Sequence, residues 1–176
     1  MITKLEYKAN RKTIIRVTTD KGHFNIYYSD IRPYWLHSRP SGFEGGRAYG
    51  IDDYVLFTML TGSRQGGVVC VWDCNQNKLV HISNGDYCSA ATIHENKVFV
   101  LCDVYNYRVR ERLEVYSYPF GTMDAWGEGT QIVSDHYKEL TALPGDEEDI
   151  RIEDNKMIIT IGKEDIVFHS DVASVL

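Results

Sequence analysis

Ile93-His94-Glu95-Asn96-Lys97 is one of four copies of a short polar or acidic turn that leads into a β-branched, apolar run. The other copies are Tyr7-Lys8-Ala9-Asn10-Arg11, Ile51-Asp52-Asp53-Tyr54 and Ile152-Glu153-Asp154-Asn155-Lys156. Short apolar runs bounded by turn signals are typical of strands. The repeat therefore predicts a chain built from similar β units.

The spacing of the turns sets the size of these units. Asn10, Asp53 and Asn96 follow one another at intervals of 43 residues, and Asn155 follows Asn96 after 59 residues. The last interval is longer because of an insertion, residues 119–135, that is rich in glycine and acid. We predict a single domain of four units, approximately residues 1–45, 46–86, 87–145 and 146–176.

Each unit is expected to hold four strands, with the repeated turn between the first and the second. The predicted third strands are residues 24–28, 68–72, 113–118 and 166–169. The predicted fourth strands are residues 34–37, 78–83, 138–143 and 172–176. One helix candidate, residues 134–143, has a capping serine and a Pro-Gly stop. The repeat favours a strand for its second half.

One hairpin carries a resemblance to a known family. Val69-Cys70-Val71-Trp72-Asp73 followed by Asn77-Lys78-Leu79-Val80-His81 resembles the third-to-fourth-strand hairpin of WD-type propeller repeats. The other units carry looser versions, and the Gly-His pair expected before the first strand is missing. A period of about 40–45 residues with four strands per unit is also the spacing of propeller blades.

We therefore predict an all-β fold of about four repeated antiparallel four-stranded units, propeller-like in arrangement. A β-sandwich or barrel of similar strands is the alternative. Four units are few for a closed ring, so the chain closes alone, with another copy of itself, or within a longer protein. Self-association is one of these three possibilities.

The composition limits the function classes. The chain has 176 residues, a net charge of −6, 12 tyrosines and only 4 prolines. An acidic balance argues against a general phosphate-binding surface, so no nucleic-acid partner is expected. No apolar run reaches the length of a membrane span, and the first residues do not resemble a signal peptide. A cytoplasmic protein without membrane contact is predicted.

No motif for catalysis, metal or cofactor binding stands out. The four cysteines, Cys70, Cys74, Cys88 and Cys102, form no Cys-x-x-Cys pair and are expected to be reduced and mostly buried. The glycines fit no phosphate loop, and the six histidines are scattered. Residues 146–149 are expected to form a solvated acidic turn. We predict no catalytic residues, no metal and no cofactor. A catalytic triad assembled from residues far apart in the sequence is the alternative.

One face of the predicted units gathers aromatic and cationic residues. It holds the loops at 38–47, 61–67, 104–111 and 143–149. The candidate partner-binding residues are Arg39, Phe43, Arg47, Arg64, Tyr105, Tyr107, Arg108 and Arg110. Tyrosine and arginine supply rigid contact area and forked hydrogen bonding, which suit a protein interface or an anionic ligand. A solvated hairpin whose arginines pair with acids is the alternative.

Three functions follow from these features. The first is a non-enzymatic, cytoplasmic protein-binding β-repeat module that uses the loop face. The second is a small acidic inhibitor or immunity-type protein that neutralises a basic toxin or enzyme. The third is an enzyme or lectin-like binder of a carbohydrate or small anion on the same face.

Overall fold

The computed structural model describes residues 1–8, 13–35, 43–61, 66–106, 109–135, 147–154 and 156–168. For 43–45, 61, 105–106, 109–111, 134–135, 164 and 167–168 it describes the backbone alone. Strands dominate these residues, and their one helix is the single turn α1 (Tyr28–Ile31). The all-β prediction is confirmed.

The chain divides into two compact structural units, called unit 1 and unit 2, which are distinct from the four repeats that the sequence predicts. Unit 1 contains Met1–Asp86 and Gly121–Glu128, and unit 2 contains Tyr87–Phe120 and Gly129–Leu176. The segment Gly121–Glu128, called the inserted segment below, therefore belongs to unit 1 although unit 2 continues on both sides of it.

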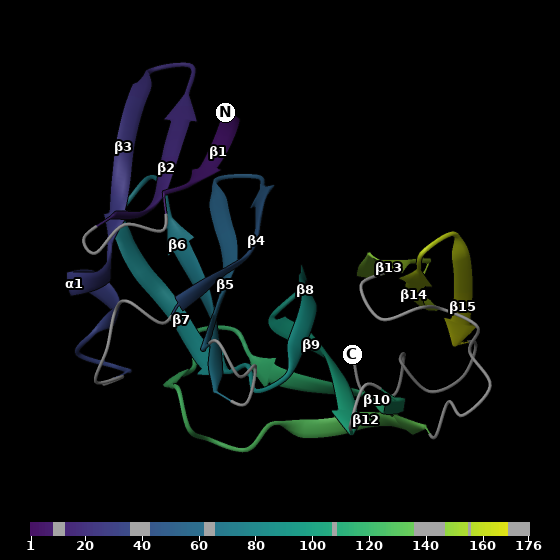
Figure 1. The fold of residues 1–176 in the computed structure, drawn as a ribbon. Coiled ribbons are helices and arrows are strands. Elements are labelled where there is room, and N and C mark those ends of the chain that lie inside the picture. Colours follow the sequence, from purple (N-terminus) through teal and green to yellow (C-terminus); the bar gives the residue numbers. More distant parts are fainter. Residues whose placement is uncertain are drawn as a thin grey trace. The chain divides into compact units, whose positions relative to one another are not determined.

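Unit 1 contains two sheets (Figure 1). The first is the antiparallel meander β1 (Ile2–Tyr7), β2 (Thr13–Thr19) and β3 (Gly22–Tyr27). The second has the order β11-β7-β6-β5-β4, from β4 (Phe43–Ile51), β5 (Tyr54–Thr61), β6 (Gly67–Asp73), β7 (Lys78–Asn84) and β11 (Met123–Asp124). Its first four strands are antiparallel, and β11 pairs parallel to β7.

Unit 2 contains the other two sheets. One has the order β12-β10-β9-β8, from β8 (Cys88–His94), β9 (Lys97–Asn106), β10 (Val109–Pro119) and β12 (Thr130–Asp135). The other is the meander β13 (Glu148–Glu153), β14 (Lys156–Ile161) and β15 (Glu164–Phe168). A cluster of aliphatic side chains and Phe99 joins these two sheets, with Leu101 and Leu113 on one side and Met157 and Ile159 on the other.

The prediction that the repeated turn joins two consecutive strands is confirmed in three copies. Strand residues pair directly across each one: Ile51 with Tyr54, His94 with Lys97, and Glu153 with Lys156. The first turn residue has a positive φ each time, 51° at Asp52, 50° at Glu95 and 50° at Asp154. This sign matches the right-handed twist of the flanking strands. Residues 9–12, in the first copy, lie outside the described residues.

β1 and β4 run in opposite directions. Ile2 packs within 3.3 Å of a Cβ built on Gly50, and Met1 and Ile2 line an open cavity together with Asp52 and Asp53. At its other end, β1 reaches the middle of β4 through the Tyr7 hydroxyl, 2.9 Å from the Arg47 carbonyl oxygen. β1 thus runs opposite to β4, so the end of β1 at the first turn lies away from Asp52-Asp53.

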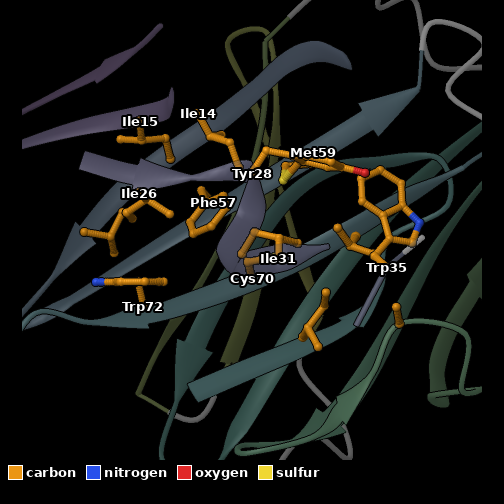
Figure 2. Packing of buried hydrophobic residues seen from close by; sticks show 14 of the residues in the cluster. Ile14, Ile15, Ile26, Tyr28, Ile31, Trp35, Phe57, Met59, Cys70 and Trp72 are labelled. Atoms are coloured by element: carbon orange, nitrogen blue, oxygen red, sulfur yellow. The ribbon is translucent and has the colours of Figure 1, made fainter. Parts of the chain in front are cut away.

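The core of unit 1 lies between its two sheets. Figure 2 shows Phe57 of β5 among Ile15, Ile26 and Ile31, with Trp72 and Trp35 at opposite ends of the group. Phe57 and Trp35 are fully buried. Truncating a buried aromatic residue of this kind to alanine costs about 3–5 kcal/mol of stability.

Two predicted fourth strands need correction. At residues 34–37, Tyr34 and Trp35 are not in a strand, because the chain after β3 turns into α1, where the Asp30 carboxylate accepts the Tyr27 amide at 2.9 Å. Trp35 then fills the core instead of pairing in a sheet. In the third predicted unit, β12 (Thr130–Asp135) occupies the place beside β10, and residues 138–143 lie outside the described part.

Candidate binding surface

The structure covers the predicted partner-binding residues unevenly. Arg39, Arg64, Tyr107 and Arg108 lie outside the described residues. Arg47 is described with its side chain and belongs to unit 1.

Phe43, Tyr105 and Arg110 are described by their backbone, which places them in strands. Phe43 begins β4 in unit 1, whereas Tyr105 of β9 pairs with Arg110 of β10 in unit 2. The prediction that these residues and Arg47 lie in loops is wrong. Backbone pairing continues past the apolar core, because ladder hydrogen bonds do not require apolar side chains.

Arg47 lies in a β-bulge that the side chains of Thr58 and Tyr7 fix. The register of β4 against β5 shifts between Gly45 and Ala48. Within this shift, the Arg47 amide donates to Thr58 Oγ1 at 2.9 Å. The Tyr7 hydroxyl contacts the carbonyl oxygens of Arg47 and Thr58 at 2.9 and 2.6 Å. The Arg47 guanidinium reaches only the Tyr49 hydroxyl in this group, at 3.4 Å.

The inserted segment contains the most exposed aromatic side chain among the described residues. Its Thr122 carbonyl accepts the Ile82 amide at 2.8 Å, and Met123 pairs with Ile82 of β7. Ala125 is 2% exposed and packs in the unit 1 core, whereas Trp126 is 60% exposed. The segment is thus fixed to the sheet on one side and presents an indole to solvent on the other.

Local geometry keeps Trp126 in this outward position. Asp124 Oδ1 accepts the Trp126 amide at 3.0 Å, which closes a tight turn. A Cβ at Gly127 would lie 2.7 Å from Asp124 Oδ2, so a larger residue there would displace the carboxylate that closes the turn. Ala125 is buried in the core, and its neighbour Trp126 is exposed to solvent.

Other large apolar side chains are exposed to a smaller extent. Met123 of the inserted segment is 39% exposed, and Tyr34 and Tyr27 near α1 are 42% and 43% exposed. Tyr34 directly precedes the buried Trp35, so these two neighbouring aromatic residues are divided between surface and core. Leu36 and His37 lie outside the described residues.

A buried carboxylate organises one face of β10. Glu114 Oε1 accepts Arg112 Nε at 2.6 Å, and Glu114 Oε2 accepts the Tyr116 hydroxyl at 3.0 Å. Gln131 of β12 donates to the same carboxylate at 3.4 Å. Burial, followed by the hydrogen bond to Glu114, raises the pKa of Tyr116 to about 12. This network fixes β12 to β10 through polar contacts.

The structure brings one serine–histidine pair together. His81 Nε2 lies 3.0 Å from Ser83 Oγ on β7, and both residues are fully buried. A nucleophile in this position lacks access to a substrate, so the pair is part of the sheet interior.

The acidic run at 146–149 is not simply a solvated turn. Glu148 begins β13 and is 4% exposed, which corrects the prediction at this residue, and Asp146 lies outside the described part. Among the described side chains, no group of three or more His, Cys, Asp or Glu could hold a metal ion.

The cysteines are free thiols, and three of them are buried, as predicted. Burial raises the pKa of the Cys70 thiol far above its usual range. The half-buried Cys74 has a pKa of about 11, because of burial first and of nearby Asp73 and Asp53 second. Both thiols are therefore protonated and weakly nucleophilic at neutral pH.

The open cavity beside β1 has a volume of about 450 Å³ and is lined by Met1, Ile2, Gly50, Asp52 and Asp53. One of its two carboxylates, Asp53, already accepts Asn75 Nδ2 at 3.0 Å. Within the described chain, no helix is long and apolar enough to cross a membrane.

Comparisons with protein-family models, curated proteins and solved structures find no match for this chain.

Proposed function

We propose that the chain is a non-enzymatic protein-binding module built from β units, and that its inserted segment contacts the partner. The observation that carries this proposal is the exposure of Trp126, at 60%, on a segment fixed by backbone pairing and by the buried Ala125. Sequence reasoning identified the insertion as a place where the units differ, but it singled out no residue within it.

The energetics favour an anchor at Trp126. Tryptophan dominates protein interfaces, because a rigid indole buries a large apolar area with little loss of side-chain freedom. Burying the exposed part of this side chain in a partner would contribute roughly 2–4 kcal/mol at the usual value per unit area. The fixed turn lowers the entropic cost of binding, because the side chain is presented before the partner arrives.

The residues around the indole indicate what it binds. The inserted segment contains Asp124 and Glu128 and no lysine or arginine. A complementary partner surface would therefore be an apolar pocket with lysine or arginine at its rim.

The test compares Trp126→Ala with Tyr27→Ala in the full chain. The partner captured by the wild-type chain is identified and purified, and its dissociation constant is measured against each variant. We expect Trp126→Ala to weaken binding by at least about 30-fold, the size of an interface hot spot. Its unfolding free energy should change by less than about 0.5 kcal/mol, because the side chain is mostly exposed.

Tyr27→Ala is the matched control, since Tyr27 is an aromatic residue of the same unit and is 43% exposed. It should bind the partner as the wild-type chain does. Equal binding by wild type and Trp126→Ala would reject the inserted segment as the contact.

A second candidate, the acidic inhibitor, is favoured by the distribution of charge. Unit 1 has 11 Lys and Arg against 10 Asp and Glu, whereas unit 2 has 8 against 15, so the negative charge belongs to unit 2. Binding through that surplus would weaken steeply between about 0.05 and about 0.5 M salt. Binding through the indole would change little, so the same partner distinguishes the two candidates.

The blade-like interpretation of the sheets and a cytoplasmic location belong to the same proposal. Two four-stranded meanders that open with the same kind of turn, β4–β7 and β8–β9–β10–β12, support repeated units. The reversed direction of β1 against β4 counts against placing the first three strands in the same series. Free, mostly buried thiols suit a reducing compartment.

A further inference from the structure

Two of the four cysteines face each other across neighbouring strands. Cys88, the first residue of β8, is the cross-strand partner of Cys102 in β9. Both side chains are buried, at 3% and 6% exposure. Cross-strand partners point to the same face of a sheet, so the two thiols share one side of the hairpin.

A β-bulge creates this pairing. The register of β8 against β9 shifts between Cys88 and Ala90, so that Ala90 pairs with Leu101 while Cys88 pairs with Cys102. In the register that Ala90 follows, Cys88 would face Asp103 instead. The bulge therefore brings the two cysteines opposite each other.

The hydrogen-bond pattern shows which kind of pair this is. The Asp103 amide donates to the Tyr87 carbonyl at 3.0 Å, so Tyr87 and Asp103 form the bonded pair. Bonded and non-bonded pairs alternate along an antiparallel ladder, which makes Cys88 and Cys102 a non-bonded pair. Such pairs have Cα atoms about 4.5 Å apart, within the range of about 4.4–6.8 Å that disulfides require.

We propose that Cys88 and Cys102 are a redox-sensitive pair that forms a cross-strand disulfide. The Cys88 thiol now donates to the Ala90 carbonyl at 3.4 Å, so its side chain must rotate toward Cys102. The backbone need not move, because the usual Cα spacing of a non-bonded cross-strand pair lies within the range of disulfides.

The oxidant is a low-molecular-weight disulfide of the glutathione class. One cysteine thiolate attacks the oxidant and forms a mixed disulfide, releasing one small thiol. The second cysteine then displaces the other small thiol, so the protein loses two protons and two electrons while the oxidant becomes two thiols. Because Cys88 starts its strand next to Tyr87, which has a φ of 57°, fraying of this strand end gives the oxidant access.

Neither of the other cysteines has such a partner. Cys70 faces Phe57 and Ile82 across its strands, and Cys74 lies in the turn after β6. Cys70 and Cys74 are therefore the control cysteines for the proposed pair. All four cysteines lie within the described chain.

The test treats the native full-length chain with oxidised glutathione and then blocks the remaining thiols. A non-reducing peptide map should show a Cys88–Cys102 link in most molecules, with Cys70 and Cys74 blocked as free thiols. Hydrogen exchange at residues 87–90 should slow after oxidation, because the link prevents fraying of the strand end. A Cys70→Ser, Cys74→Ser variant should form the same link, and Cys88→Ser should form none.

The wild-type map decides the proposal even if a variant fails to fold. A map in which Cys88 and Cys102 remain free, keep only a glutathione adduct, or link to Cys70 or Cys74 would overturn it. The same result would follow if the link appeared only when denaturant was present during oxidation, since native strand pairing would then play no part.

Discussion

Glu95 holds a backbone conformation that glutamate rarely adopts. Its φ is 50°, in the left-handed region where Cβ approaches the following carbonyl oxygen. That arrangement costs roughly 1 kcal/mol for most side chains and less for asparagine. We predict that Glu95→Asn raises the unfolding free energy by about 0.5 kcal/mol and that Glu95→Val lowers it by at least about 1 kcal/mol.

Urea denaturation of the two variants measures this difference. Asp52→Asn is the matched control, because Asp52 starts another copy of the turn with a φ of 51°. It should change stability less, since aspartate already tolerates this conformation. Equal stabilities for Glu95→Asn and Glu95→Val would contradict the account of the turns.

Gly46 lies so close to Thr58 that a larger side chain should not fit at this position. A Cβ at this position would overlap the hydroxyl and carbonyl oxygens of Thr58, which hold the bulge of β4. We predict that Gly46→Ala lowers the unfolding free energy by at least about 2 kcal/mol, because the bulge must distort to accept the methyl group. The midpoint of urea unfolding reports this loss.

Gly50→Ala in the same strand is the control, since its new Cβ would meet only the flexible Ile2 side chain, at 3.3 Å. It should cost clearly less than Gly46→Ala. If both variants had the same stability, the close approach of Thr58 would not be the reason for glycine at position 46.

At the scale of an element, the polar face of β10 makes stability depend on alkaline pH. The folded chain keeps the Tyr116 proton up to about pH 12, whereas an unfolded tyrosine loses it near pH 10. The folded state binds more protons between these values, so the unfolding free energy falls as pH rises from about 10 to about 12. We predict that Tyr116→Phe reduces this slope.

The same substitution should cost about 1 kcal/mol near neutral pH, where it removes the hydrogen bond to Glu114. Unfolding measured near pH 8 and near pH 11 separates the two effects, with Tyr27→Phe as an exposed control. An unchanged slope in Tyr116→Phe would show that other groups cause the alkaline loss.

The elements also show how far the sequence predicts the fold. Hairpins set by short turns were predictable, because residues such as Asp52-Asp53 and Glu95-Asn96 act locally. The predicted fourth strand at residues 78–83 is confirmed as part of β7. The one at residues 34–37 is wrong, since Trp35 could fill a core or pair in a sheet equally well by pattern. The pairing of Cys88 with Cys102 was hidden because it depends on a one-residue bulge, which apolar periodicity does not reveal.

At the scale of the whole molecule, the candidate surface was predicted only in part. The sequence identifies the insertion as a place where the predicted repeats differ in length, whereas the predicted binding residues all lie outside it. It could not show that Ala125 enters the core and Trp126 faces solvent, because that depends on the pairing of Met123 with Ile82 on β7. The role of Arg39, Arg64, Tyr107 and Arg108 in partner binding stays a prediction, because these residues lie outside the described part of the chain.

The distribution of charge is also a property of the whole molecule. The net charge of −6 does not describe a uniform surface, because unit 1 is nearly neutral by count and unit 2 carries the surplus of acids. The two candidate binding modes therefore belong to different units, the indole to unit 1 and the acidic surplus to unit 2.

The most direct test of the central claim is site-specific photo-cross-linking in living cells. A photoreactive phenylalanine analogue is placed at position 123 of the inserted segment in one full-length variant, which keeps Trp126, and at position 27 in another. Met123 is 39% exposed, so a probe there can reach a partner that binds the indole. We predict that position 123 links to one protein in high yield and that position 27 does not link to it. Absence of a specific product at position 123, or the same product at both positions, would contradict the assignment of the inserted segment as the binding surface.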